Sequence, residues 1–306
     1  MSKPPRNYRD VDGILLFDKS LGLSSNAALQ QVRHLFGAKK AGHAGSLDPL
    51  ATGLLPICFG QATKVCGRLL NSSKSYLVTV QLGATTLSLD SETPITETAA
   101  VPELSDAQVD AVLAAFLGEQ EQIPPMHSAL KHQGQRLYDL ARRGESVERA
   151  SRRIMIDRIH RIGFADHRLT FEVRCSKGTY IRSLAADIAA KFGTLGYVAA
   201  LRRLAVDPFD GRPMYELPQL EALLRGGAMA SLDALLLPAD AAFSDLGDTH
   251  LGSASEQGLL KGQTVAALTP APSGQLRAYA PGGRFLGLVE GQADGRVKPT
   301  RLFVGH

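Results

Sequence analysis

Two segments of the chain, 76–82 and 169–175, alternate apolar and polar residues, and this alternation limits the folds available to it. Such a pattern is typical of β-strands that bury one face and leave the other partly in solvent. The apolar positions are Tyr76, Val78, Val80 and Leu82 in the first segment and Leu169, Phe171, Val173 and Cys175 in the second. The sequence therefore predicts a sheet that rests on a core by one face.

Three further segments have helical periodicity. The first spans 24–36 and ends at Gly37, the second begins at Ser105 with a capping box to Gln108, and the third has its apolar stripe over 184–192. The helices are unevenly spaced among the strands, and regular βαβ alternation is missing. We therefore expect an α+β fold with a central mixed or antiparallel sheet and flanking helices.

The texture of the sequence changes after about residue 240. Short segments such as QLRAYA, RFLGLVE and RLFV are separated by turn signals, including Pro281-Gly282-Gly283. This pattern predicts a small all-β C-terminal domain. We place the larger domain at residues 1–245 and the second domain at residues 246–306.

Composition narrows the class of protein. The 306 residues are 44% hydrophobic, enough for one large domain and a small one. The first 13 residues are polar, and no later run reaches the roughly 18 apolar residues of a membrane span, so we expect a soluble, cytoplasmic protein that contacts no membrane. The three cysteines form no C-x-x-C pair, which argues against a disulfide framework or a cysteine-rich zinc site. Nothing in the sequence requires more than a monomer.

Positive charge is concentrated in one segment of the chain. Residues 131–168 contain ten Lys or Arg against five Asp or Glu, although the whole chain carries a net charge of only +4. A solvated surface would explain this excess. A surface that contacts nucleic-acid phosphates would also explain it, because arginine predominates, and Tyr138, His132 and His160 could stack on bases.

A single carboxylate occupies the glycine-rich stretch GHAGSLDPLATGLLP, from Gly42 to Pro56. Asp48 could be a turn residue before Pro49 or a functional carboxylate. The chain has no phosphate-binding G-x-x-x-x-G-K-[ST] loop, no G-x-S-x-G elbow and no H-E-x-x-H pair, so nucleotide-phosphate, serine hydrolase and metal hydrolase chemistries are disfavoured. Carboxylate chemistry at Asp48 remains.

Several collinear blocks resemble the TruB family of tRNA pseudouridine-55 synthases. They cover about two thirds of the chain, and the block around Asp48 is highly specific. The blocks are GILLFDKSLGLSS (13–25), GHAGSLDPLATGLLPICFGQATK (42–64), Lys74-Ser75-Tyr76, IPPMHSALKHQGQRLYDLARR (123–143) and CSKGTYIRSL through LRRL (175–204). The resemblance implies a pseudouridine-synthase catalytic domain, with the small C-terminal domain as a PUA-like RNA-binding module.

The resemblance also implies the reaction. One uridine of the tRNA T loop, at position 55, is flipped out, its glycosidic bond is broken, and the base rejoins its ribose through carbon 5. This isomerisation requires neither a redox cofactor nor a metal. Asp48 takes the catalytic position, either by covalent attack or as the base that removes a ribose proton. A role as a tRNA folding chaperone is a second activity that the resemblance allows.

The resemblance assigns partners to Asp48. Arg182 is implied to keep the carboxylate ionised by paired hydrogen bonds, so lysine should replace it poorly. Tyr76 is implied to lie against the extracted uracil, because a flipped base needs a π face in place of its lost stacking. The remaining implied contacts are Tyr180 and Leu201 as pocket walls and His43 in the gap that the base leaves in the T loop.

The chain departs from the family pattern in two places. The first is Lys19-Ser20-Leu21-Gly22, where the family has Lys-Pro-x-Gly; Lys19 is retained as an implied substrate contact. The second is the segment 86–93, where Leu87 and Thr93 replace an aspartate and a glycine. Asp90 is retained, and we expect it to help neutralise Arg182 in the empty site.

Residues of about 124–153 match a family insertion that closes over tRNA. We expect its basic part, residues 131–153, to be mobile in the free enzyme, because a positively charged segment with glycines has little reason to pack before RNA arrives. The residues predicted to contact the RNA backbone are Lys64, Lys131, Arg142, Arg143, Arg152 and Arg153.

Two alternatives to a stand-alone tRNA enzyme are open. The chain could be an RNA-binding chaperone whose catalytic centre is incidental, or it could resemble the guide-RNA-dependent relatives that serve ribosomal RNA. Joint retention of Asp48, Tyr76, Tyr180, Arg182 and Leu201 favours an enzyme, and the long insertion favours direct reading of tRNA.

Overall fold

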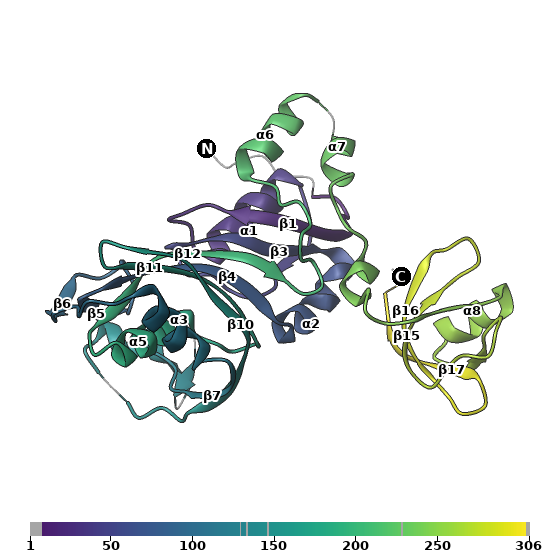
Figure 1. The fold of residues 1–306 in the computed structure, drawn as a ribbon. Helices are drawn as coiled ribbons and strands as arrows, with labels where there is room; N and C mark the ends of the chain where they lie inside the picture. The colour runs from purple at the N-terminus through teal and green to yellow at the C-terminus, as the bar shows by residue number, and fades with distance from the viewer. Residues whose placement is uncertain (1–7, 129, 133, 146, 228, 304–306) are drawn as a thin grey trace.

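The computed structural model describes residues 8–303 apart from 129, 133, 146 and 228. Its centre is a mixed sheet in the order β1-β3-β12-β4-β11-β10-β7, with β2 beside β3 (Figure 1). Neighbouring strands are antiparallel except β12 and β3, which are parallel. The strands are β1 (Gly13–Lys19), β2 (Ala41–His43), β3 (Ala51–Phe59), β4 (Lys74–Leu82), β7 (Gly118–Gln122), β10 (Arg152–Ala165), β11 (Arg168–Cys175) and β12 (Gly196–Val206).

The two strands predicted from alternation are β4 and β11, which pair with each other along their whole lengths. In contrast, every residue of β1 is buried, and its side chains enter two cores: Leu15 and Phe17 face one, and Ile14 and Leu16 the other. β3 is buried in the same way. A strand covered on both faces has no alternation to detect, which is why the pattern did not reveal these two.

The three predicted helices are α1 (Ser25–Leu35), α3 (Asp106–Ala114) and α5 (Ile181–Lys191). The capping box at Ser105 is present, and the Ser24 hydroxyl caps α1. Helices α3 and α5 lie together over the part of the sheet formed by β4, β10 and β12 (Figure 1). This packing places the first turn of α5 near the start of β3, where the candidate site lies.

Shorter elements surround this framework. The helices are η1 (Gly60–Val65), α2 (Cys66–Asn71), α4 (Leu137–Arg142), α6 (Leu217–Arg225), α7 (Met229–Asp233) and η2 (Ala239–Phe243). Two small hairpins pair β5 (Ala84–Thr86) with β6 (Ile95–Thr98), and β8 (Lys131–His132) with β9 (Gln135–Arg136). The β5–β6 hairpin carries the loop that contains Asp90.

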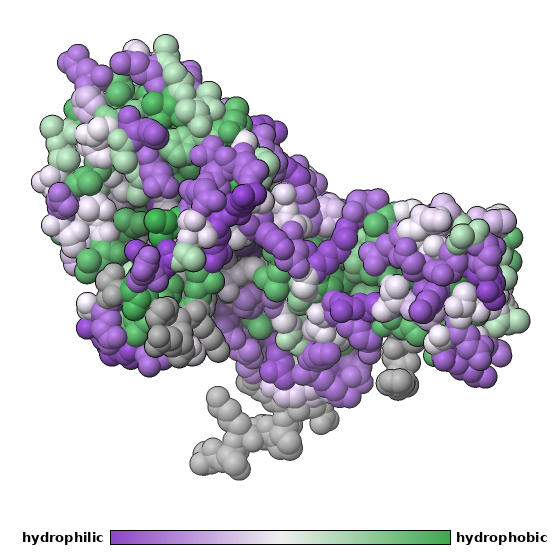
Figure 2. Space-filling view, turned by 90° about the horizontal axis from the view of Figure 1, so that it is seen from below, coloured by the Kyte–Doolittle hydropathy of each residue, from purple (hydrophilic) through white to green (hydrophobic). Residues whose placement is uncertain are grey.

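The C-terminal part forms a separate lobe (Figure 2). Its sheet has the order β13-β15-β16-β17-β14. The strands are β13 (Asp248–His250), β14 (Val265–Ala266), β15 (Gly274–Tyr279), β16 (Phe285–Gly291) and β17 (Arg296–Leu302). One helix, α8 (Ser253–Leu260), was missed by the all-β prediction because its sequence, SASEQGLL, has no apolar stripe and buries only Leu259.

The two lobes share an aromatic contact. Phe243 packs against Phe285 and Phe303, and the Lys64 ammonium donates to the Leu302 carbonyl at 2.8 Å. A cavity of about 1010 Å³ opens beside this junction, lined in part by Arg68, Asn71 and Arg301. It includes none of the residues predicted around Asp48.

The remaining composition-based expectations concern membranes and cysteines. Within the described part of the chain, no helix combines the length and the apolar character needed to cross a membrane. Cys58, Cys66 and Cys175 are free thiols, and Cys58 and Cys175 are buried, as expected for small core residues.

Candidate active site

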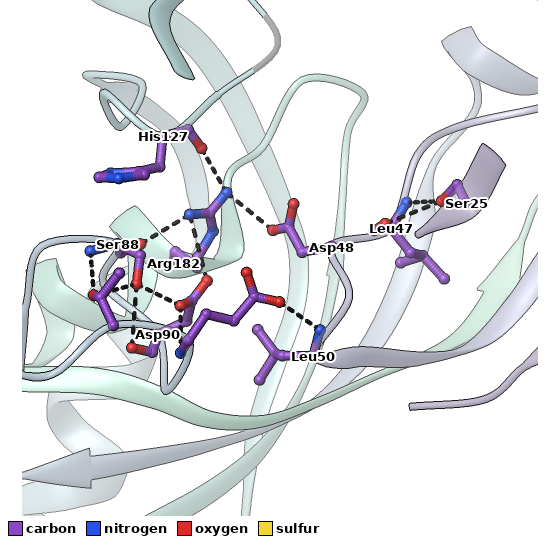
Figure 3. A network of polar contacts seen from close by, with 10 residues as sticks. Ser25, Leu47, Asp48, Leu50, Ser88, Asp90, His127 and Arg182 are labelled. Carbon is purple, nitrogen blue, oxygen red and sulfur yellow. Dashed lines mark hydrogen bonds and ion pairs between the residues drawn. The ribbon is translucent and has the colours of Figure 1, made fainter. Parts of the chain in front are cut away.

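The side chains of Asp48 and Arg182 come from distant segments of the chain and lie next to each other (Figure 3). Asp48 lies in the loop between β2 and β3, and Arg182 is the second residue of α5. The Arg182 Nη2 atom is 2.9 Å from the Asp48 Oδ2 atom. The side chain of Arg182 is 7% exposed, whereas that of Asp48 is 42% exposed. The carboxylate is thus held from the protein side by a buried cation and is open on the other side.

The Arg182 guanidinium has further partners that fix its plane. It donates to the backbone carbonyls of Ser88 at 2.8 Å and His127 at 2.7 Å, and its Nη1 atom is 3.4 Å from the Asp90 Oδ2 atom. A lysine has a single ammonium and could not reach two carbonyls and two carboxylates at once. The predicted pairing of Asp90 with Arg182 is present in this geometry.

The charges around Asp48 act in opposite directions. Burial raises the pKa of the Asp48 carboxyl above its ordinary value, and the nearby Asp90 adds to the rise, while Arg182 and Lys19 oppose it. Burial also raises the pKa of Glu92, with a further contribution from Asp90. Arg182 therefore pairs with Asp48 and Asp90, and its charge opposes the rise in pKa of both Asp48 and Glu92.

Side chains from outside the Asp48 loop hold its backbone. The Ser25 hydroxyl accepts from the Leu47 amide at 2.7 Å and donates to the Leu47 carbonyl at 3.0 Å. The Glu92 carboxylate accepts from the Leu50 amide at 2.9 Å. The loop is therefore fixed on both sides of Asp48 before any substrate is present.

Lys19 contributes from inside the protein. It is fully buried, and its ammonium donates to the carbonyls of Ser20 at 2.9 Å, Leu23 at 2.7 Å and Pro49 at 3.4 Å. Burial lowers its pKa to about 8. The ammonium faces backbone rather than open space, so an effect of Lys19 on substrate would act through the Asp48 loop.

The divergent segment 86–93 keeps its form through its own polar contacts. The Asp90 carboxylate accepts from the Ser88 hydroxyl at 2.5 Å and the Glu92 amide at 3.0 Å. Thr93, at the position of the family glycine, accepts from the Ser88 amide at 3.1 Å. Leu87 is 69% exposed and leaves the network undisturbed.

Tyr76 and Leu201 come from adjacent strands. Tyr76 lies in β4 opposite Arg203 of β12, and Leu201, two residues earlier in β12, pairs with Val78. Leu201 is buried and Tyr76 is partly exposed, and both belong to or pack on the larger core. The apolar side chain of Leu201 and the accessible ring of Tyr76 therefore come from neighbouring strands.

His43 and Tyr180 lie at the ends of elements. His43 ends β2, and burial followed by the charge of Arg203 lowers the pKa of its imidazole. Tyr180 is the residue before α5, and its backbone exchanges hydrogen bonds with the Gln122 amide group at 2.8 and 3.0 Å. The Arg152 guanidinium lies 5.4 Å from the centre of the Tyr180 ring.

Three of the other basic residues predicted to bind RNA, Lys64, Arg143 and Arg153, have protein partners in this structure. Arg143 pairs with Glu145 at 2.6 Å, and Arg153 with Glu119 at 3.3 Å. Lys64 contacts the C-terminal lobe, as noted above. The side chains of Lys131 and Arg142 lie outside the described residues. The paired arginines are consistent with the solvated-surface interpretation, and their RNA contacts remain predictions.

The sequence reasoning missed Arg203, Glu92 and Ser88. Ser88 and Glu92 act through a backbone carbonyl and a carboxylate in a segment that departs from the family pattern, so nothing marked them. Arg203 did leave a signal, because it is a charged residue within an apolar strand, LRRLAV. Among the described residues, no group of three or more His, Cys, Asp or Glu side chains is arranged to hold a metal ion.

Comparison with known proteins agrees with the sequence blocks. Residues 33–181 match the model described as "TruB family pseudouridylate synthase (N terminal domain)". Residues 182–244 match "tRNA pseudouridylate synthase B C-terminal domain", and residues 248–303 match "Pseudouridine synthase II TruB, C-terminal". Together these models span most of the chain.

Similar curated proteins cover the chain almost completely. A tRNA pseudouridine synthase B from Pseudomonas fluorescens Pf-5 is 46% identical over 302 residues, 99% of each chain. One from Chromohalobacter salexigens is 46% identical over 97% of this chain and 96% of its own. Among solved structures, one chain of a Cbf5-Nop10-Gar1 complex superimposes with a TM-score of 0.73 at 19% identity, covering 99% of this chain and 91% of its own. The structural likeness shows a shared fold and confirms the predicted α+β architecture.

Proposed function

The chain belongs to the TruB family of pseudouridine synthases, and on that premise we propose that it converts uridine 55 in the T loop of tRNA into pseudouridine. The observation that carries the proposal is the Asp48–Arg182 pair, in a chain 46% identical to a curated tRNA pseudouridine synthase B. A partly exposed carboxylate held by a buried guanidinium is the arrangement that this isomerisation needs.

The proposed mechanism starts with extraction of the target base. Unstacking costs a few kcal/mol, and stacking on Tyr76 would return about 1–3 kcal/mol. Leu201 and Tyr180 would line the pocket, and His43 would fill the gap in the T loop. His43 suits this place because burial and Arg203 disfavour its charged form, leaving a neutral ring that can stack.

The chemical step then uses Asp48. The bond between N1 of uracil and C1′ of ribose breaks, either after attack of the carboxylate on C1′ or after it removes a ribose proton. The base leaves as its N1 anion and turns, and a bond forms between C5 and C1′. This breaks the ester bond to Asp48 in the first route, and in the second route Asp48 returns the proton to the ribose. The proton on C5 is lost to water and N1 takes up a proton, so the product is an isomer of the substrate. Arg182 favours the anionic form of the carboxylate, which either route needs at its start, because it opposes the rise in pKa that burial causes.

The proposed division of labour follows the two lobes. The catalytic domain would span residues 1–245, with the basic insertion of about 124–153 closing over the RNA, and residues 246–306 would form an RNA-binding module. The lobes are joined through η1 and β17, where Arg301 donates to the Lys64 carbonyl at 2.8 Å. This contact would keep the module in a fixed place while the T arm binds.

The test is incubation of purified protein with an unmodified T-arm stem-loop, followed by carbodiimide-based detection of pseudouridine. We expect product at the T-loop uridine with the wild type and none with Asp48→Asn. A matched control is Asp10→Asn, because Asp10 is an exposed carboxylate paired with Lys39. Binding of the RNA without conversion by the wild type would contradict the proposal and favour the chaperone interpretation.

A further inference from the structure

Arg203 is a buried cation without a carboxylate partner. It is 1% exposed, and within the described part of the chain no Asp or Glu oxygen lies within ion-pair distance of it. Its neighbour Arg202 points to the other face of β12 and pairs with Asp18 through hydrogen bonds of 3.0 and 2.5 Å. A buried charge is costly unless its hydrogen bonds are satisfied, so the contacts of Arg203 explain why it is tolerated.

The guanidinium donates two hydrogen bonds, one to each end of the Asp48 loop. Its Nε atom donates to the Leu54 carbonyl at 2.6 Å, and its Nη2 atom donates to the Gly45 carbonyl at 3.0 Å. Gly45 precedes Asp48 in the loop, and Leu54 follows it in β3. One planar side chain therefore links the entry and the exit of the loop that carries the catalytic carboxylate.

At two positions of the Asp48 block, Gly45 and Gly53, Arg203 leaves little or no room for a side chain. A Cβ at Gly45, where φ is +87°, would lie 3.3 Å from the Arg203 Nη1 atom. A Cβ at Gly53 would lie 2.2 Å from the Arg203 carbonyl oxygen, because β3 and β12 run in parallel with these two residues in register. Gly45 therefore leaves room for the Arg203 guanidinium, and Gly53 lets the backbone of β3 approach that of β12 at Arg203.

The charge of Arg203 also reaches the predicted substrate contacts. Tyr76 is its direct cross-strand neighbour, and the cation opposes the rise in the phenol pKa that burial causes. It lowers the pKa of His43 and contributes to lowering those of Lys19 and Lys74. Among the described residues, the charge of Arg203 thus acts on the pKa values of groups in β4, β2 and β1.

We propose that Arg203 is a positioning residue for the reaction: it ties Gly45 to Leu54 so that Asp48 is held against Arg182, and, as the cross-strand partner of Tyr76, it fixes the place of that ring. The inference rests on the proposed function for its kinetic consequence. Because Arg203 is buried, we expect it not to contact the base or the ribose. Its replacement should therefore lower the rate of conversion and leave the affinity for RNA unchanged.

The test compares Arg203→Lys with Arg202→Lys under single turnover on the T-arm stem-loop. A lysine keeps the charge but cannot bind the two carbonyls in the same plane. We expect Arg203→Lys to slow conversion at least tenfold, with the RNA dissociation constant within threefold of wild type. Arg202→Lys should remain within threefold in both quantities. A rate within twofold of wild type for Arg203→Lys, or equal losses in the two variants, would overturn the proposal.

A second measurement is independent of catalysis. The imidazole of His43 should titrate by NMR below the ordinary value of about 6.5 in the wild type, with the resonance assigned by His43→Gln. The titration should stay low in Arg203→Lys and move upward in Arg203→Met. If neither Arg203 variant folds, an ordinary or raised His43 titration in the wild type would still overturn the proposal. If the wild type makes no pseudouridine, the proposed function fails, while this titration still decides where the charge of Arg203 acts.

Discussion

Replacing Arg182 by methionine should expose the energetic difference between its two carboxylate partners. Asp90 is 1% exposed, and Arg182 is the cation that the structure places within 4 Å of its Oδ2 atom. Removing the guanidinium would leave a buried carboxylate supported only by the Ser88 hydroxyl and the Glu92 amide. Breaking a buried pair in this way costs about 3–5 kcal/mol of the free energy of unfolding.

A double-mutant cycle then compares the buried partner of Arg182, Asp90, with its partly exposed partner, Asp48. Asp90→Asn in the Arg182→Met background removes the stranded charge, and we expect it to restore about 2 kcal/mol of the loss. Asp48→Asn in the same background should restore less than about 1 kcal/mol, because the Asp48 side chain is 42% exposed and water solvates it once the guanidinium is gone.

The assay is urea unfolding at pH 7 followed by far-UV circular dichroism, since the chain has no tryptophan. The coupling energies come from the four proteins of each cycle. Equal coupling of Arg182 to Asp90 and to Asp48, or a cost of less than about 1 kcal/mol for Arg182→Met, would refute the reasoning that the buried end of this network carries its stability.

Three other predictions follow from the same structure. Arg182→Gln should move the acid limb of kcat/KM to higher pH, because the guanidinium now opposes the rise in the pKa of Asp48; an unmoved limb would contradict this. Lys74 has a pKa of about 8 in the fold against 10.5 ordinarily, so the folded protein binds fewer protons between these values. The free energy of unfolding of the wild type relative to Lys74→Met should therefore rise with pH across that window in denaturant titrations, by at most about 1.4 kcal/mol per pH unit, and a falling difference would contradict it. Tyr76→Ala should weaken T-arm binding by about 1–3 kcal/mol in a filter assay while Tyr76→Phe leaves it unchanged; equal losses would argue against stacking.

The sequence revealed those parts of the fold that carry a periodic pattern. β4 and β11 alternate because one face is partly solvated, and α1, α3 and α5 have apolar stripes with caps. β1 and β3 are buried on both faces, and β3 also contains Gly53 and Pro56, which local rules do not favour in a strand. Their place in the sheet depends on packing from segments far away in the chain.

The site divides in the same way. Local chemistry identified Asp48 as unusual, and the family resemblance supplied Arg182, which the structure places 2.9 Å away. Glu92 was not predicted, because it acts on a backbone amide of a remote loop, and a backbone partner leaves no mark on sequence spacing. The charge of Arg203 within an apolar strand was visible in the sequence, but nothing there indicated its backbone partners. Lys19 was named from the resemblance, but only the structure shows its ammonium on the Pro49 carbonyl.

The central claim is that Asp48 moves the glycosidic bond of a T-loop uridine from nitrogen to carbon 5. The most direct measurement uses a T-arm stem-loop with tritium on carbon 5 of that uridine, since joining C5 to the ribose must release the label to water. We predict release of one tritium for each RNA with the wild type and none above background with Asp48→Asn at equal RNA occupancy. Release by Asp48→Asn at the wild-type rate, or no release by the wild type on bound RNA, would contradict the account.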